Sequence, residues 1–262
     1  MPGWLLLGVI IPTVQSYLII ACIFCLIVAL ELRWPRGEAA IRWNAVRFAL
    51  FFTPASIVIV LLIDQAMRSL GVGVSAPLLS LSGAAKIIAG LLIGDFLAYW
   101  LHRAQHAIPA LWRLHSVHHS IEAFGPLTGY QHLAEVPLSF LLYTLPVAIL
   151  VGAPSAMIIS ILTGLFVSYL HSTTRLNFGR WNRIICDNRA HRIHHSTESH
   201  HFDHNFGMLT MVWDRLFGTA YFPDRDEWPD IGLDDMPEPK SLRDFVAAPF
   251  RRRAGVEQAA EA

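Results

Sequence analysis

The chain has 262 residues, of which 54% are hydrophobic and 15% are charged, and its mean hydropathy is +0.44. Soluble domains carry about 25% charged residues, so this composition argues against a cytosolic globule and against a disordered chain. Because 20 basic residues balance 20 acidic ones, no overall positive charge is available to bind nucleic acid.

The first predicted element is a membrane-spanning helix at residues 1–30, which contain no charged side chain. A cleaved signal peptide is the alternative, but it would have a basic start and a shorter apolar core. Cys22 and Cys25 lie inside this run, which favours packing cysteines over a redox pair. We therefore expect a retained helix.

Three further apolar segments follow, at residues 48–63, about 78–101 and 136–170. The last contains Gly152-Ala153-Pro154, which predicts a helical hairpin because helices end at glycine and before proline. Arginines cluster after the first and last apolar segments, and such clusters mark the cytoplasmic side of a membrane protein. The sequence predicts an all-α integral membrane protein with four to five transmembrane helices and a cytoplasmic helical cap.

All 13 histidines lie between His102 and His204. A lone buried histidine is more often a satisfied core residue than a ligand. Many imidazoles beside membrane helices, however, would be costly to bury without a metal. Eight histidines exceed the four ligands that one zinc ion takes, so we expect two ions in the cap. The eight form three sets in which residues three or four apart share a helix face: His102 and His106; His115, His118 and His119; His191, His194 and His195.

A neutral imidazole shell around two cations also predicts nearby polar groups that orient the rings and offset the charge. Asp95 and Tyr99 share one helix face with His102 and His106, so they are the candidates. The alternative for Asp95 is a buried ion pair with Lys86, although nine residues place the two on opposite faces.

Further histidines are candidates to complete the metal shells. His132 lies three residues before Glu135, and His171 follows the last apolar segment. The last three histidines follow the third set in a polar loop, where solvated or interfacial side chains are favoured over metal ligands: His200, His201 and His204.

Several enzyme classes are excluded by motifs that the sequence lacks. It contains no H-E-x-x-H of zinc proteases, no two Glu-x-x-His motifs as in carboxylate di-iron bundles, and no glycine-rich nucleotide-binding loop. A histidine-rich dinuclear site at a membrane surface suits attack by iron and dioxygen on an unactivated C–H bond of a lipid. A transition-metal transporter or sensor is one alternative, but it would have ionisable residues through several spans. A bis-histidine haem carrier would leave most of the histidines unexplained.

The three histidine sets resemble the boxes of the fatty acid hydroxylase / sterol desaturase superfamily of membrane di-iron oxygenases. The resemblance covers about residues 91–222, with the boxes at 95–106, 111–120 and 190–196 in family order. The segments Asn205-Phe206-Gly207 and 213–219 resemble the part that follows the third box. His132-Leu133-Ala134-Glu135 departs from the family's His-Pro-x-Glu by lacking the proline. Residues 187–189 also depart from the family's proline-containing approach to the third box.

The resemblance implies two iron ions held by the eight box histidines, with His132 and His171 as added ligands and Glu135 as a supporting carboxylate. It implies O2 as co-substrate, and a sterol, fatty acyl, isoprenoid or ether lipid that is hydroxylated or desaturated. A separate electron donor of ferredoxin or cytochrome type, with its reductase, is expected because the chain has no cysteine set for an iron–sulfur cluster.

Three regions follow from these expectations. Residues 1–77 would form N-terminal transmembrane helices and connectors, 78–222 a catalytic fatty acid hydroxylase-like domain, and 223–262 a polar C-terminal tail. All but two of the 20 basic residues are arginine, which suggests a GC-rich bacterial genome and the bacterial inner membrane. The alternative location is the endoplasmic reticulum.

Overall fold

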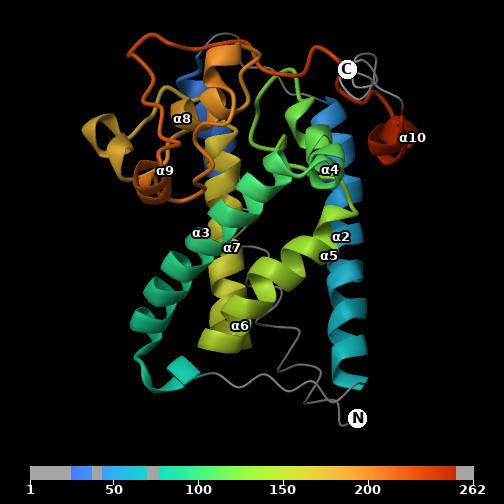
Figure 1. Ribbon diagram of the computed structural model, residues 1–262, viewed down its shortest axis with the longest axis vertical. Coiled ribbons are helices and arrows are strands. Elements are labelled where there is room, and N and C mark those ends of the chain that lie inside the picture. Colours follow the sequence, from blue (N-terminus) through green and yellow to red (C-terminus); the bar gives the residue numbers. More distant parts are fainter. Residues whose placement is uncertain (1–24, 37–42, 70–76, 252–262) are drawn as a thin grey trace.

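A computed structural model describes residues 25–36, 43–69 and 77–251 (Figure 1). The span predicted at residues 1–30 lies mostly outside them, and its last residues belong to a helical segment at 25–33. The described chain is helical and forms no β-strand; its extended pairing is limited to isolated bridges such as Pro35 with Thr174.

Two helices are long and apolar enough to cross a membrane, α2 (Trp43–Ser69) and α3 (Gly83–Ala107). The hydroxyl of Ser82 caps α3 by accepting a hydrogen bond from the backbone of Ala85. The helix ends before Ile108, which is extended because Pro109 follows it. A 3-10 turn, η1 (Pro77–Ser80), precedes α3.

The predicted hairpin is present as two shorter apolar stretches. The first is built from α5 (Glu135–Ser139), the π-helical turn η2 (Phe140–Thr144) and α6 (Leu145–Val151). The second is α7 (Ala153–Leu170). Between them Gly152 has a φ of 85°, which glycine adopts readily, so the chain reverses there as expected. Both stretches pack against α3.

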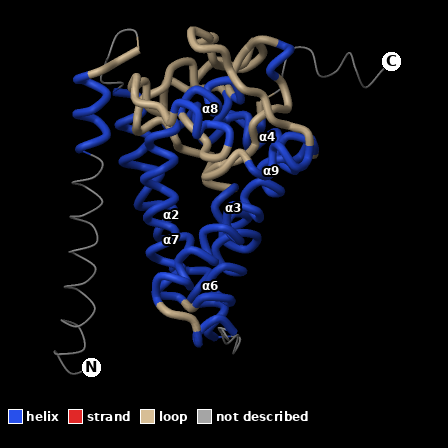
Figure 2. Tube along the Cα trace, turned by 90° about the vertical axis from the view of Figure 1, so that its left-hand side faces the viewer, coloured by secondary structure: helices blue, strands red, loops and turns tan. Residues whose placement is uncertain are grey.

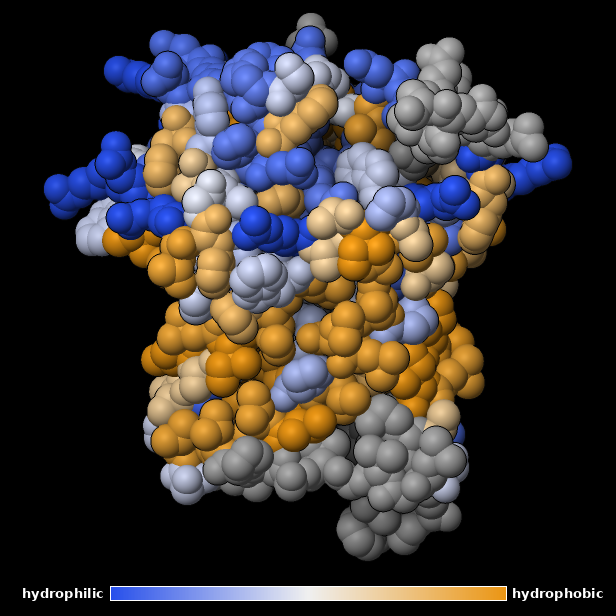
Figure 3. All heavy atoms as spheres, in the orientation of Figure 1, coloured by the Kyte–Doolittle hydropathy of each residue, from blue (hydrophilic) through white to orange (hydrophobic). Residues whose placement is uncertain are grey.

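Short helices and loops form a polar cap at one end of the long helices (Figures 1 and 2). On the face that Figure 3 shows, apolar residues cover the helices below the cap. The cap therefore lies where a polar headgroup layer or solvent would meet the membrane helices. Its helices are α4 (Pro109–His119), η3 (Gly179–Arg183), α8 (Asn188–His194), η4 (Ser199–His201), α9 (Val212–Phe217), α10 (Leu242–Ala247) and η5 (Ala248–Phe250).

The C-terminal region contributes to the core of the cap. Phe245 of α10 is fully buried and stacks on Phe48 of α2, with ring centroids 5.2 Å apart. Ile231 and Met236 are buried in the same cluster, together with Tyr130. The region predicted as a polar tail, 223–262, thus packs against α2 and the cap as far as residue 248.

Candidate metal centre

Four elements bring the histidines together in the cap. α3 carries His102 and His106, and the turn at Ile108 directs α4 back so that His115 and His119 face them. α8 carries the third set, and His171 caps the end of α7.

Two polar side chains fix α8: Asp187 caps the helix, and Asn188 joins it to the chain that follows α7. Asp187 caps α8 by accepting from the backbone N–H groups of Arg189 and Ala190. The amide of Asn188 donates to the carbonyls of Ser172 and Thr174, at 3.1 and 2.8 Å. These contacts set the distance between the third histidine set and His171.

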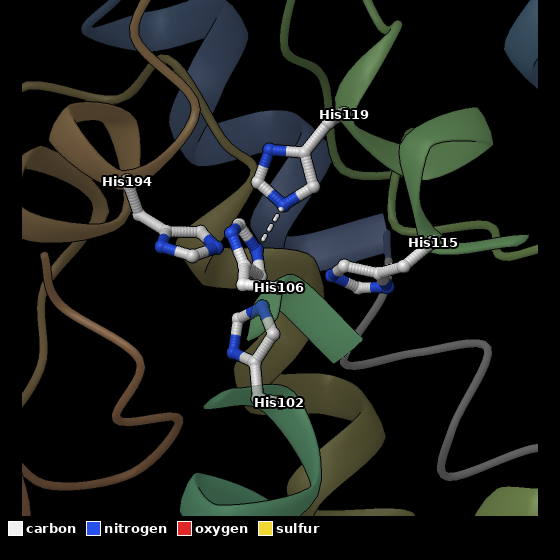
Figure 4. Close-up of side chains that lie close together, drawn as sticks. All are labelled: His102, His106, His115, His119 and His194. Atoms are coloured by element: carbon white, nitrogen blue, oxygen red, sulfur yellow. Dashed lines mark hydrogen bonds between the residues drawn. The ribbon is translucent and has the colours of Figure 1, made fainter. Parts of the chain in front are cut away.

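The rings converge in two groups. Within each group, one nitrogen of every ring lies within 4.8 Å of a nitrogen of all the others. The first histidine group draws on α3, α4 and α8, as Figure 4 shows. The first histidine group is His102, His106, His115, His119 and His194, and the second histidine group is His118, His171, His191 and His195.

The spacing of the nitrogens fits a shared metal ion in each group. Nε2 of His106 lies 3.0 Å from Nε2 of His119 in the first histidine group. In the second, Nε2 of His171 lies 3.3 Å from Nε2 of His118 and 3.2 Å from that of His191. Ligands at about 2.1 Å from one ion, at angles of about 90–105°, are separated by about 3.0–3.3 Å.

The hydrogen positions on His118 and His171 favour a cation between the two rings. Nδ1 of His118 lies 2.9 Å from the carbonyl oxygen of Tyr130, and Nδ1 of His171 lies 2.9 Å from that of Val167. A carbonyl oxygen only accepts, so each Nδ1 carries the hydrogen and each Nε2 presents a lone pair. Two lone pairs 3.3 Å apart repel one another unless a positive ion lies between them.

Burial keeps the rings neutral. It lowers the pKa of His171 to about 4, and that of His118 well below its usual range, with neighbouring imidazoles adding to the effect on His118. Burial is also the main reason why the pKa values of His195 and of the other histidines of α4 and α8 are lowered. Neutral imidazole is the form that binds a metal.

Several buried nitrogens that face the groups have no hydrogen-bond partner within the described part of the chain. They include Nε2 of His102, His115 and His194, and both ring nitrogens of His195. A buried polar atom without a partner costs about 1–3 kcal/mol, so native proteins rarely keep several together. Metal coordination would satisfy the three Nε2 atoms and one nitrogen of His195, so the donor set fits two transition-metal ions.

Glu135 lies directly behind the first histidine group. Its carboxylate accepts from Nδ1 of His115 at 3.0 Å, from the amide of Gln105 at 2.5 Å and from the backbone of His132 at 3.2 Å. The contact with His115 orients a ring as a supporting carboxylate would. The His132 ring belongs to neither group: Nε2 donates to the carbonyl of Val246, and Nδ1 accepts from the backbone of Ala134.

Asp95 and Tyr99 make polar contacts with residues that follow the third histidine set. The carboxylate of Asp95 accepts from the backbone of Leu209, the hydroxyl of Thr210 and the indole of Trp213. The hydroxyl of Tyr99 lies 3.0 Å from that of Thr219. Both residues thus join α3 to the chain after the third histidine set.

The last three histidines lie apart from both groups. His201 is buried, with Nδ1 2.8 Å from the hydroxyl of Ser196 and Nε2 2.9 Å from the carboxylate of Glu227. The side chain of His200 is 59% exposed. His204 contacts the first histidine group through its backbone carbonyl, which lies 2.8 Å from Nδ1 of His194. Sequence patterns give no signal for such backbone acceptors.

A cavity of about 570 Å³ opens beside the two groups. Five histidines from both groups form one end of it, and its walls come from α2, α3, α7 and the π-helical turn. Along α7 the lining runs from His171 to Ser160, about 16 Å of helix. The described residues that line it include no Asp, Glu, Lys or Arg. The cavity thus suits an uncharged, elongated ligand.

Comparison with known proteins agrees with this arrangement. The family model described as Fatty acid hydroxylase matches residues 87–219, just over half of the 262 residues. The chain belongs to the fatty acid hydroxylase family. The match spans the three histidine sets and both groups that they form.

Relatives of this fatty acid hydroxylase family member include a bacterial and two vertebrate proteins. Ornithine lipid hydroxylase OlsE of Rhizobium tropici is 32% identical over 66% of this chain and 53% of its own length. Alkylglycerol monooxygenase is 30% identical in Danio rerio and 29% in Homo sapiens, over 49% and 48% of this chain. The chain covers 29% and 28% of those two relatives. No solved structure matches the chain significantly.

Proposed function

We propose that this protein is an O2-dependent membrane oxidoreductase that uses two iron ions to hydroxylate or desaturate an unactivated C–H bond of a lipid. The observation that carries the proposal is the pair of buried, neutral histidine groups that together form one end of an uncharged cavity. Zinc has no redox chemistry, whereas iron binds imidazole and reacts with O2. Hydroxylation and desaturation would use the same ligands, so the proposal covers both.

Each part of the site has a role in this reaction. Iron bound in the two groups would supply O2 activation and electron transfer. The eight box histidines and His171 would hold the ions, and Glu135 would fix the ring of His115. The walls of the cavity would hold the lipid against the histidines and exclude water from the reacting carbon. His132, which lies outside both groups, would support the site through the chain around Glu135.

The lipid would be a sterol, a fatty acyl chain, or an isoprenoid or ether lipid. Relatives named as an ornithine lipid hydroxylase and as alkylglycerol monooxygenases support a lipid substrate. Because no charged residue lines the cavity, a charged headgroup would stay outside it while an uncharged part of the lipid enters. Electrons would come from a separate ferredoxin- or cytochrome-type donor with its reductase.

The same proposal includes four to five membrane spans with the site on the cytoplasmic face. Two described helices are long enough to span, and α7 would rise about 27 Å over its 18 residues. The hairpin stretches and the segment at 1–30 would supply the remaining spans. Arg175, Arg180 and Arg183 follow α7 and would lie on the cytoplasmic side. We place the protein in a bacterial inner membrane, with the endoplasmic reticulum as the alternative.

Within that arrangement, residues 78–222 would form the catalytic unit. Residues 1–77 would supply membrane helices, and 223–262 would complete the cap through their buried side chains.

Untargeted lipid mass spectrometry tests the proposal. Membranes of cells that express the wild type are compared, under 18O2, with those of cells that express the His118→Ala variant. A lipid that gains one labelled oxygen identifies a hydroxylase, and one that loses two hydrogens identifies a desaturase. Metal accumulation that depends on the protein, without any change in lipids, would instead support a transporter or sensor.

A further inference from the structure

Two rings of the first histidine group are held by one short backbone segment. Nδ1 of His102, on α3, lies 3.0 Å from the carbonyl oxygen of Phe206. Nδ1 of His194, on α8, lies 2.8 Å from the carbonyl oxygen of His204. The second histidine group takes its carbonyls from other places, as described for His118 and His171. The two carbonyls of residues 204–207 that contact histidine rings thus both belong to the first group's contacts.

The direction of each of these two carbonyls is set by the hydrogen bond that the N–H group of the same peptide makes. In a trans peptide, the N–H and the C=O point in opposite directions within one plane. The N–H paired with the Phe206 carbonyl is that of Gly207, and it donates to Asp214 at 2.7 Å. The N–H paired with the His204 carbonyl is that of Asn205, and it donates to the carbonyl of Thr219 at 2.9 Å. Fixing these N–H groups therefore directs each carbonyl toward its histidine.

Asp214 and Thr219 are joined to each other and to α3. Asp214 is fully buried, and its second oxygen accepts from the backbone of Phe206 at 2.8 Å and from the Thr219 hydroxyl at 2.7 Å. Because that hydroxyl uses its hydrogen on Asp214, the hydroxyl of Tyr99 donates to Thr219. Tyr99 precedes His102 by one helical turn, so α3 contacts the segment at two points.

The local backbone leaves little freedom to move. Asn205 has a φ of 58°, which asparagine tolerates, and its side-chain amide donates to the carbonyls of Ala190 and Tyr221. A Cβ added to Gly207 would lie 2.2 Å from the carbonyl oxygen of Thr210, so only glycine fits there. The segment is thus a rigid support.

We infer that Asp214 and Thr219 are positioning residues for the first histidine group. The carboxylate of Asp214 fixes the peptide whose carbonyl orients His102, and the Thr219 hydroxyl holds that carboxylate. The backbone carbonyl of Thr219 fixes the peptide whose carbonyl orients His194. This inference rests on the proposed function only in taking the first group as a metal site. Loss of a group that orients a metal-bound histidine lowers metal affinity by about 10–100-fold. Loss of the Asp214 carboxylate or the Thr219 hydroxyl should therefore lower the metal affinity of the first histidine group and leave that of the second unchanged.

Cobalt titration of the metal-free, full-length protein in detergent tests the inference. Visible absorption and bound metal per chain give two binding constants, and His191→Ala identifies which constant belongs to the second group. Asp214→Asn and Thr219→Val should weaken the other constant by about 10–100-fold, while Thr219→Ser, which keeps the hydroxyl, should restore it. Asp226→Asn, at an exposed position in the cap, is the control.

A second measurement needs no metal, so it also applies if the proposed metal function fails. Diethyl pyrocarbonate modifies accessible neutral histidines, and mass spectrometry locates the label. In Asp214→Asn we expect a several-fold rise at His102 and His194 and no change at His118 and His171. Unchanged labelling and binding in Asp214→Asn would overturn the inference. An equal loss in both groups, with a lower melting temperature, would overturn it too, because it would show a general structural role.

Discussion

Replacing Glu135 with glutamine tests whether this carboxylate supports the first histidine group. The carboxylate is fully buried and accepts from three donors, on His115, Gln105 and the backbone of His132. Glutamine has one acceptor oxygen, so its NH2 group must face one of these donors in either orientation. If it faces His115, Nδ1 must give up its hydrogen, and Nε2 then carries that hydrogen and cannot bind metal.

Metal binding therefore forces the other orientation, with the NH2 group against the backbone N–H of His132. A buried donor left unsatisfied costs about 1–3 kcal/mol, which is about a 5- to 150-fold loss of affinity. Competition with a chromophoric chelator measures both metal constants, and Glu122→Gln, an exposed glutamate of the cap, is the matched control. We expect only the first-group constant to fall. Equal constants in wild type and Glu135→Gln would refute the role of Glu135.

Three other changes test the cavity, the cap and the metal. Gly164 lines the cavity, and a Cβ added there would meet no atom within 4 Å, so Gly164→Leu should fill part of the cavity and lower lipid turnover by about tenfold or more without loss of metal. Gly83→Leu, equally unhindered but outside the cavity, should leave turnover unchanged. Equal turnover in the two variants would contradict the proposal that the lipid enters this cavity. Phe245→Ala should lower the free energy of unfolding by about 3–5 kcal/mol, measured by chemical denaturation; a change below about 1 kcal/mol would show that α10 does not belong to the core. Chelation should abolish product formation, and Fe(II) but not Zn(II) should restore it; recovery with zinc would exclude redox chemistry.

Helical spacing in the sequence predicts the three histidine sets, but it does not predict how their members divide between the two groups. In α4, His115 and His119 are four residues apart and share the first group, whereas His118 belongs to the second. In α8 and its cap, His191 and His195 share the second group and His194 belongs to the first. Positions i+3 and i+4 lie about 100° apart around a helix, so they can face different ions. Which ion each faces depends on how α3, α4 and α8 pack.

The sequence predicts only some of the groups that support the histidines. The position of Glu135 three residues after His132 predicts a supporting carboxylate, and in the structure this carboxylate contacts His115. Asp95 and Tyr99 share the face of the first histidine pair, yet their partners are residues about 115 positions later in the chain. Contacts between distant segments leave no periodic pattern in a sequence. Backbone carbonyls leave none either.

The C-terminal region illustrates the same limit. Ile231 and Met236 are isolated among prolines and acidic residues, and Phe245 lies in an apolar run of four residues, which is too short to show a helical or strand period. The sequence pattern therefore does not predict that this region packs in the cap. Ile231, Met236 and Phe245 are nevertheless buried with residues of α2 and α4. Their burial depends on a surface that the rest of the fold creates.

Iron content measures the central claim most directly. Protein purified without oxygen is loaded with excess Fe(II), freed of unbound metal and analysed by mass spectrometry of the metal, beside His194→Ala and His191→Ala. The two-group arrangement predicts two iron ions per chain in the wild type, with the first variant losing the ion of the first histidine group and the second losing the other. One iron or fewer per wild-type chain would contradict it.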